Sequence, residues 1–147
     1  MGDSKAVTDL TFKHLNHGWN AEPNAPEERV SVSGDTVHLT FYLNPWAYAA
    51  EEEERATLSF GNCSAWRLGG TNDEGWYKGQ CRYSGIAPAW GEFYEISGQD
   101  ARQPQPDDWH LLAGRAAEPR HFLFYLRDCT FECFAAGWRL ERNGPAN

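Results

Sequence analysis

Hydrophobic and polar residues alternate with a period of two along several stretches of the chain. The clearest stretch runs from Val37 to Leu43, where every second residue is apolar. Because successive side chains of a β-strand point to opposite faces, this pattern predicts a half-buried strand. Residues 30–33 alternate as well, and Gly34–Asp35 supplies a tight turn, so residues 29–43 are predicted to form a hairpin.

Later regions show the same alternation. Apolar and polar residues alternate over 56–60 and again over 66–68, which predicts further strand structure. Residues 120–127 are apolar on both faces, which is typical of a central strand with cover on both sides. Residues 130–140 add at least one more strand, with a break at Gly137, so the chain should end with a central strand and its antiparallel partner.

Helical patterning is weak by comparison. Residues 44–55 combine an N-cap residue, a proline at the first helical position and good helix formers, so a short helix and an acidic loop fit equally well there. Residues 69–75 are mostly turn formers and predict an exposed loop, and residues 99–108 predict another. The sequence therefore predicts an all-β fold, either an antiparallel β-sandwich or a small barrel, with at most one short helix.

Length and charge narrow the class of protein. The 147 residues suit one β domain spanning 1–147. The net charge is -8 and no basic run occurs, which argues against nucleic acid as a partner. No apolar run is long enough for a membrane span or for the core of an export signal, so we expect a cytoplasmic protein without membrane contact.

The cysteines do not form a metal-binding or redox motif. No CxxC pair occurs, and we predict neither a metal site nor a cofactor. Cys129 and Cys133 lie too far apart along one strand for a disulfide. A bond between Cys63 and Cys81 stays open, beside the more ordinary expectation of free, buried thiols.

The segment FKHLNHGWNAEPN at 12–24 is rich in residue types found at metal and catalytic sites. His14 and His17 are three residues apart, so a regular strand would place them on opposite faces, which opposes a shared metal ion. Leu10 shares a face with His14, which predicts a hydrogen-bonded histidine at the edge of the core. The pattern leaves open whether His17 or Trp19 reaches the aromatic stretch that follows.

The densest aromatic and acidic stretch is 71–98. Its candidate binding residues are Trp76, Tyr77, Trp90, Asp73, Glu74, Glu92 and Tyr94. Rings beside carboxylates suit sugars or cations, because a ring face packs on apolar or cationic groups while a carboxylate holds hydroxyls. The same rings would equally fill the core of a small β protein, with their polar neighbours in water.

Glu92 is the sharpest candidate within that stretch. In a strand over 90–96 it shares a face with bulky apolar residues, where burial raises a carboxyl pKa unless a cation such as Lys78 or Arg82 pairs with it. Glu95 points to the opposite face, so the paired carboxylates of a glycoside hydrolase are missing. No GxSxG, phosphate-loop or GxGxxG motif occurs, and the sequence favours a binding protein over an enzyme.

Two stretches resemble known groups of proteins. TNDEGWY at 71–77, together with WGEFYE at 90–95, resembles small bacterial proteins of unassigned function. HFLFYLRDCTFEC at 121–133 is similar to the closing hairpin of some β-rich toxin-immunity proteins. The first resemblance implies a bacterial origin without a particular activity, and the second implies a protein that binds another protein.

Two functional hypotheses follow. In the first, aromatic residues of 73–95 anchor a protein partner and acidic residues select its charge, as an immunity protein would against a basic toxin. In the second, the same rings line a cavity for a small ligand, and Glu92 or His14 performs acid–base chemistry. A flat, exposed aromatic patch favours the first hypothesis, whereas a deep pocket around Glu92 favours the second.

Overall fold

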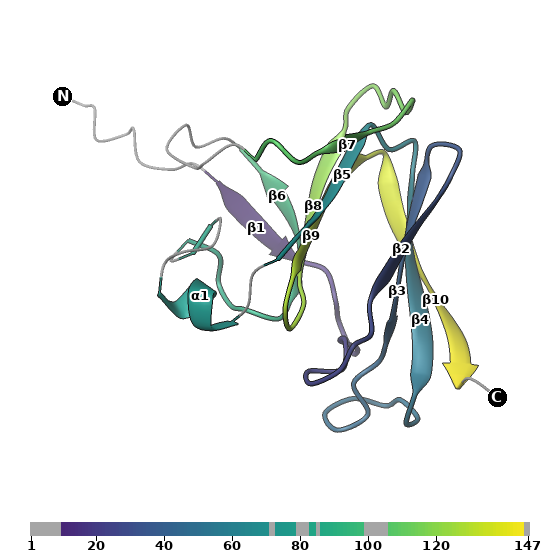
Figure 1. Ribbon diagram of the computed structural model, residues 1–147, viewed down its shortest axis with the longest axis vertical. Helices are drawn as coiled ribbons and strands as arrows, with labels where there is room; N and C mark the ends of the chain where they lie inside the picture. Colours follow the sequence, from purple (N-terminus) through teal and green to yellow (C-terminus); the bar gives the residue numbers. More distant parts are fainter. Residues whose placement is uncertain (1–9, 71–72, 79–82, 85, 99–105, 146–147) are drawn as a thin grey trace.

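The computed structural model describes residues 10–70, 73–78, 83–84, 86–98 and 106–145, which form two antiparallel sheets packed face to face (Figure 1). The six-stranded sheet contains, in spatial order, β1 (Thr11–His14), β6 (Phe93–Ser97), β8 (Arg120–Tyr125), β9 (Thr130–Ala135), β5 (Ala65–Gly69) and β7 (His110–Leu111). The four-stranded sheet contains β10 (Gly137–Pro145), β4 (Glu54–Gly61), β3 (Thr36–Tyr42) and β2 (Arg29–Ser33).

This arrangement confirms the predicted all-β class and selects the sandwich from its two alternatives. The larger sheet ends in β1 and β7 and the smaller one in β10 and β2, so neither sheet closes into a barrel. The part of the chain that the structure describes contains one helix, α1 (Asp73–Tyr77), which is a little over one turn long. No helix there has the length and apolar character needed to cross a bilayer.

The predicted hairpin over 29–43 is formed by β2 and β3. Their closing pair is Ser33–Thr36, which leaves Gly34 and Asp35 as the two turn residues. Gly34 has a φ of 64°, and a II′ turn needs a positive φ at this position, which glycine adopts without a Cβ clash. The alternating pattern and the turn residues therefore agree on the register.

The predicted central strand is also confirmed, because β8 lies between β6 and β9. Phe122 and Phe124 belong to the core between the sheets, whereas Leu123 and Tyr125 belong to a second cluster on the opposite face. All four side chains are at most 1% exposed. A strand that is apolar on both faces thus has cover on both faces.

Of the short helix and the loop that fitted residues 44–55 equally well, the structure has the loop, which continues up to the start of β4. Its first residues form turns in which the Asn44 side chain accepts hydrogen bonds from the backbone N–H groups of Trp46 and Ala47, at 2.8 and 3.3 Å. An Asx turn of this kind competes with the helix that the same residues could begin.

The expectation of an exposed loop over 69–75 is wrong at Gly69, which is buried at the end of β5, and from Asp73 onward, where α1 begins. A helix this short has little stability of its own, and packing of its Trp76 against the sheet supplies what local propensity does not. Of the second predicted loop, residues 99–105 lie outside the described residues, and 106–108 adopt no regular structure.

The main core between the sheets is built largely from aromatic rings. Phe60 of the four-stranded sheet lies 6.1 Å from Phe93 and 5.3 Å from both Phe122 and Phe131 of the six-stranded sheet, between ring centroids. Pairs at these separations attract one another beyond the area they bury. Trp19 is 8% exposed and belongs to the same core.

The face of the four-stranded sheet that points away from this core is polar. The Nδ1 atom of His38 lies 2.9 Å from the hydroxyl of Ser59, and the hydroxyls of Thr40 and Thr57 lie 3.1 Å apart. Such cross-strand polar pairs are typical of a sheet face in contact with water.

Candidate functional site

The outer face of the six-stranded sheet differs, because it carries a second apolar cluster. The buried members are Tyr83, Ala87, Tyr94, Ile96, Leu123 and Tyr125, and Leu10, Phe12, Trp76 and Trp90 pack against them. Strands β1, β6 and β8 form the base, and the segment with α1 lies over this face (Figure 1). The aromatic stretch that the sequence singled out is therefore the cover of this sheet.

Trp76, Trp90 and Tyr125 form one part of this cover. The ring centroids of Trp90 and Tyr125 are 4.7 Å apart, and Trp76 lies 6.2 Å from Trp90 and 6.4 Å from Tyr125. Both tryptophans are half-buried. They thus combine the two roles that the sequence left open, since one side of each packs on the second cluster and the remainder is accessible.

Trp76 also carries an unsatisfied polar atom. Its indole Nε1 is buried and has no hydrogen-bond partner, a situation shared by one other described side-chain atom, the Nε of Arg55. An indole N–H can only donate, and leaving a buried donor without an acceptor costs about 1–3 kcal/mol. Because the atom is closed to solvent, a bound molecule could supply an acceptor only after a shift of the indole ring.

The neighbouring residues of α1 are the most accessible part of this region. Tyr77 is 74% exposed, and its ring stands edge-on to Trp76 with centroids 5.1 Å apart. Glu74 is exposed as well and forms a 3.1 Å ion pair with Lys78, one turn further along. Asp73 is the first residue of α1. We call Trp76, Tyr77 and Trp90 the aromatic cluster.

Tyr94, another candidate from the sequence, is 2% exposed and belongs to the base of the second cluster. Its hydroxyl donates a hydrogen bond to the carbonyl oxygen of Ala89 at 3.3 Å, and burial raises its pKa above the ordinary value. Tyr94 therefore supports the aromatic cluster from below and is not a surface contact.

Glu92 lies immediately before β6, at the corner where β1 ends. Its Oε1 accepts hydrogen bonds from His14 Nε2 at 2.9 Å and from Asn16 Nδ2 at 2.8 Å. The Oδ1 of Asn16, a residue 2% exposed, accepts the backbone N–H of Phe93 at 2.9 Å. The side chains of Glu92 and His14 are 26% and 43% exposed, so this corner is open to solvent.

Of the two cations expected beside Glu92, only Lys78 lies among the described residues, and it does not pair with Glu92. Lys78 pairs with Glu74 instead, and Arg82 lies outside the described residues. His14 is hydrogen-bonded at the edge of the core, as predicted. An imidazole beside a carboxylate is a combination that enzymes use for acid–base catalysis.

The expectation that His14 and His17 face apart is wrong. Their ring centroids are 4.9 Å apart, because β1 ends at His14 and the chain has left the strand conformation before it reaches His17. Alternation of faces holds only while a strand continues. No group of three or more potential metal ligands occurs among the residues that the structure describes.

Trp19 does not reach the aromatic cluster. It packs in the main core, with its ring stacked on Phe41 at 6.0 Å and close to Phe93 and Phe124. Trp19 is therefore a core residue and not a binding residue. His14 and His17 remain exposed at the corner near Glu92.

A buried ionic network that was not among the predicted sites lies on the other half of the outer face of the six-stranded sheet. Glu132 on β9 is 0% exposed. Its Oε2 accepts a hydrogen bond from His121 Nε2 at 2.7 Å, and its Oε1 accepts one from Arg67 Nη1 at 3.1 Å. Arg67 also donates two hydrogen bonds to Asp108, at 2.7 and 3.2 Å.

Strand register explains this network, because Arg67 of β5 stands directly opposite Glu132 of β9. Burial alone would lower the pKa of Arg67, but Asp108 and Glu132 together raise it, and Arg67 in turn lowers the pKa of Asp108. The His121 ring stacks on Phe134 at 4.5 Å and is only 13% exposed. Because Glu132 is closed to solvent, the network favours a structural role in which Glu132 joins β9 to its neighbours β5 and β8.

One signal in the sequence would have located Glu132. It is the single charged residue in the strand TFECFA, and it shares a face with Thr130 and Phe134. A charged side chain in the middle of an apolar strand is rarely buried without partners, so partners should have been sought on neighbouring strands.

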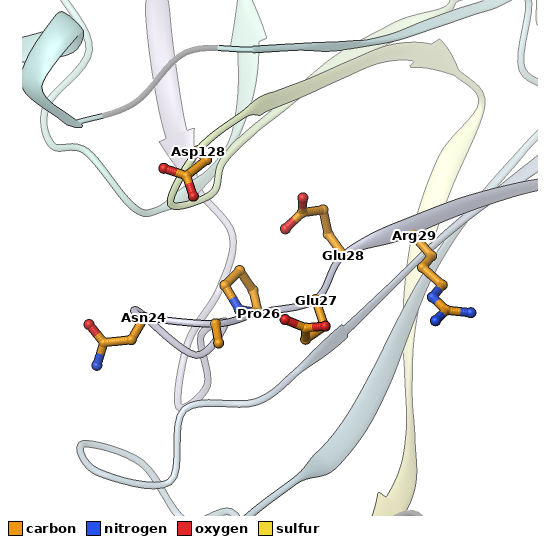
Figure 2. A pocket seen from close by; sticks show the side chains of 7 residues that line it. Asn24, Pro26, Glu27, Glu28, Arg29 and Asp128 are labelled. Atoms are coloured by element: carbon orange, nitrogen blue, oxygen red, sulfur yellow. The ribbon is translucent and has the colours of Figure 1, made fainter.

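A cavity of about 330 Å³ lies elsewhere, where the segment before β2 meets the turn between β8 and β9 (Figure 2). It is lined by Asn24, Ala25, Pro26, Glu27, Glu28, Arg29 and Asp128. Figure 2 shows the Glu28 side chain extending toward the turn that carries Asp128. The cavity shares no lining residue with the aromatic cluster.

The described cysteines are not reactive groups of a site. Cys63, Cys129 and Cys133 are free and buried, as expected, and Cys81, the possible partner of Cys63, lies outside the described residues. Burial raises the pKa of Cys129 and of Cys133, whereas a hydrogen bond with Cys133 lowers that of Cys63. Nucleophilic thiols need a stabilised thiolate and access, and burial denies access to all three.

Comparisons with protein-family models, with curated proteins and with solved structures gave no match to this chain. The function is therefore argued from the geometry of the two sheets and of the residues that cover them.

Proposed function

We propose that this chain is a non-enzymatic binding protein that holds a protein partner through its aromatic cluster. The observation that carries the proposal is Tyr77, a ring 74% exposed that lies beside the half-buried rings of Trp76 and Trp90. Because the Trp76 N–H is buried, a partner would accept its hydrogen bond only after a shift of the indole ring exposes it. The exposed Tyr77 ring would at the same time lose contact with water.

Rigid aromatic side chains suit this role. Tryptophan and tyrosine supply a large part of the binding energy at many interfaces, because they bury much area and lose little conformational freedom. Trp90 rests on Tyr125 at 4.7 Å, which holds the cluster in place before a partner arrives. Preorganisation of this kind lowers the entropic cost of association.

Charge supports a basic partner. The net charge is -8, and acidic residues flank the cluster at Glu74 and Glu92. A surface potential of this sign accelerates encounter with a positively charged surface and disfavours acidic ones. An immunity-like role in the cytoplasm of a bacterium, with a basic toxin as the partner, is the specific form of the proposal.

The test is capture of partners from a lysate of the source organism by the immobilised protein, with mass spectrometry as the readout. Tyr77→Ala and Trp76→Phe should each reduce the captured partner by about tenfold, since a central aromatic contact contributes more than 1.4 kcal/mol. Trp46→Ala is the matched control, because Trp46 is 68% exposed but lies outside the cluster. Equal capture by all variants would refute the proposal.

A small-ligand or catalytic role for Glu92 and His14 is the second candidate. It is favoured by the 2.9 Å contact between the two side chains at a solvent-open corner. Its test is ligand-induced thermal stabilisation across a metabolite library, compared between the wild type and Glu92→Gln. Ligands that stabilise only the wild type would favour this candidate, and none should do so if the aromatic cluster is the site.

A further inference from the structure

The four edge strands of the two sheets differ in how well they are protected. An open edge presents unpaired backbone N–H and C=O groups, and proteins usually shield it with charge, proline, a bulge or short length. β7 has two residues, β1 carries Lys13, and β10 has a bulge between Arg142 and Gly144 and ends at Pro145. The five residues of β2, RVSVS, have only a terminal arginine as protection.

Register defines the backbone groups that β2 leaves open. In a two-residue hairpin the closing pair, here Ser33–Thr36, is hydrogen-bonded, and hydrogen-bonded pairs then alternate with non-bonded ones. The N–H and C=O groups of Val30 and Val32 therefore point away from β3. Val32 is also 43% exposed, and no described strand pairs with β2 on that side.

The acidic cavity lies at the start of this edge. Glu27 and Glu28 directly precede β2, and Asp128 faces them from the β8–β9 turn (Figure 2). Two cations are near. The Arg29 side chain extends away from Glu28 and Asp128 in Figure 2, whereas Arg127 makes a long, 3.7 Å contact with Asp128 and donates a 3.3 Å hydrogen bond to Asn24. The carboxylates outnumber the cations, so the cavity favours a positive charge.

We infer that β2 binds an extended segment of another protein by strand addition, and that the cavity before β2 receives a lysine or arginine side chain of that segment. Backbone hydrogen bonds to Val30 and Val32 would supply affinity, and the side chain in the cavity would supply selectivity. A second copy of the chain fits less well, because two chains of net charge -8 repel each other. β2 belongs to the sheet opposite the aromatic cluster, and the cavity shares no lining residue with that cluster, so the inference does not depend on it.

The probe is a fluorescent, terminally blocked peptide in which Thr and Val alternate and a Lys stands at each end, with anisotropy as the readout. We expect saturable binding that weakens with salt, since screening reduces the attraction between Lys and the carboxylates. The same peptide with Glu at both ends should not bind. A peptide with N-methyl groups on every internal backbone nitrogen should lose binding, because neither of its edges can donate hydrogen bonds to β2.

Val32→Pro tests the edge from the protein side. The Val32 N–H points outward, so proline removes it without removing a hydrogen bond to β3. Affinity for the Lys peptide should fall roughly tenfold or more, whereas Val32→Thr, which keeps the N–H, should bind like the wild type. If Val32→Pro proves unstable, the N-methylated peptide provides the same test with the unaltered protein.

Glu28→Gln tests the cavity. Loss of one partly exposed charge pair should weaken Lys-peptide binding about threefold, while Glu52→Gln, an equal charge change outside the cavity, should leave it unchanged. Equal affinity for the Lys and Glu peptides, or binding that survives both Val32→Pro and backbone methylation, would overturn the inference. Sedimentation showing a dimer that Val32→Pro dissociates would also overturn it, by assigning the edge to a second copy of this chain.

Discussion

The outer faces of the two sheets have opposite character. On the four-stranded sheet, polar pairs such as Thr40–Thr57, with hydroxyls 3.1 Å apart, cover the face and need only water beside them. On the six-stranded sheet, the corresponding face buries Leu123 and Tyr125 to 0% and 1% exposure beneath the segment that contains α1. A sandwich needs only one core, so the second cluster exists to position that segment, and the segment carries the exposed ring of Tyr77.

Among the variants that compare the two outer faces, a shortened side chain in the second cluster should lower the free energy of unfolding most. Leu123→Ala removes a fully buried side chain from the outer face of β8 and should lower the free energy of unfolding by about 2–5 kcal/mol. Thr57→Ala, on the outer face of the four-stranded sheet, should lower it by less than about 1 kcal/mol. Urea denaturation of both variants measures the difference, and similar small losses would mean that the second cluster does not form.

Neutralisation of Glu132 should have the next largest effect. Glu132→Gln keeps the size of the side chain but replaces one acceptor by a donor between Arg67 and His121, so we expect a loss of about 1–3 kcal/mol in urea denaturation. Glu52→Gln, at an exposed position, should change stability by less than about 0.5 kcal/mol. A loss no larger than that of the control would show that the network does not join the strands.

Acid titration should reveal the outer member of the same network. Arg67 lowers the pKa of Asp108 below its ordinary value of 3.8, so the folded state favours the ionised carboxylate. The resulting stabilisation is present above about pH 4 and is lost as the pH falls through the lowered pKa. Its size should be below about 1 kcal/mol, because the Asp108 side chain is 50% exposed.

Asp108→Asn is the variant that isolates this effect. Its free energy of unfolding should lie below that of the wild type at neutral pH and converge with it in acid, measured by urea denaturation across the pH range. A constant difference between the two proteins at every pH would instead assign the loss to packing or hydrogen bonding that does not depend on ionisation.

The alternation of apolar and polar residues predicted those parts of the fold that depend only on residues within one strand or one hairpin. Alternation and Gly34 define the β2–β3 hairpin, and apolar residues on both sides of 120–127 identify β8 as central. The segment with α1, which covers the outer face of the six-stranded sheet, was not predictable in this way. α1 depends on contacts of Trp76 with Trp90 and Tyr125, which are distant in sequence, so a stretch of turn formers gave no indication of a helix.

The site was only partly predictable for the same reason. The sequence located the aromatic stretch but could not separate the buried Tyr94 from the exposed Tyr77. The closeness of His14 and His17 depends on where β1 stops, and the burial of Glu132 depends on Arg67 from another strand. Each of these features arises from contacts between segments that local patterns do not connect.

The free protein keeps the Trp76 N–H buried and unsatisfied beside the surface that we propose binds a partner. Unfolding free energies of Trp76→Phe and Trp90→Phe test this claim most directly, because both changes shorten a half-buried ring of the same cluster, but only Trp76→Phe removes an unpartnered buried donor. We expect Trp76→Phe to be less destabilising than Trp90→Phe by about 1 kcal/mol or more. A larger loss for Trp76→Phe would show that its N–H is already satisfied and would contradict the claim.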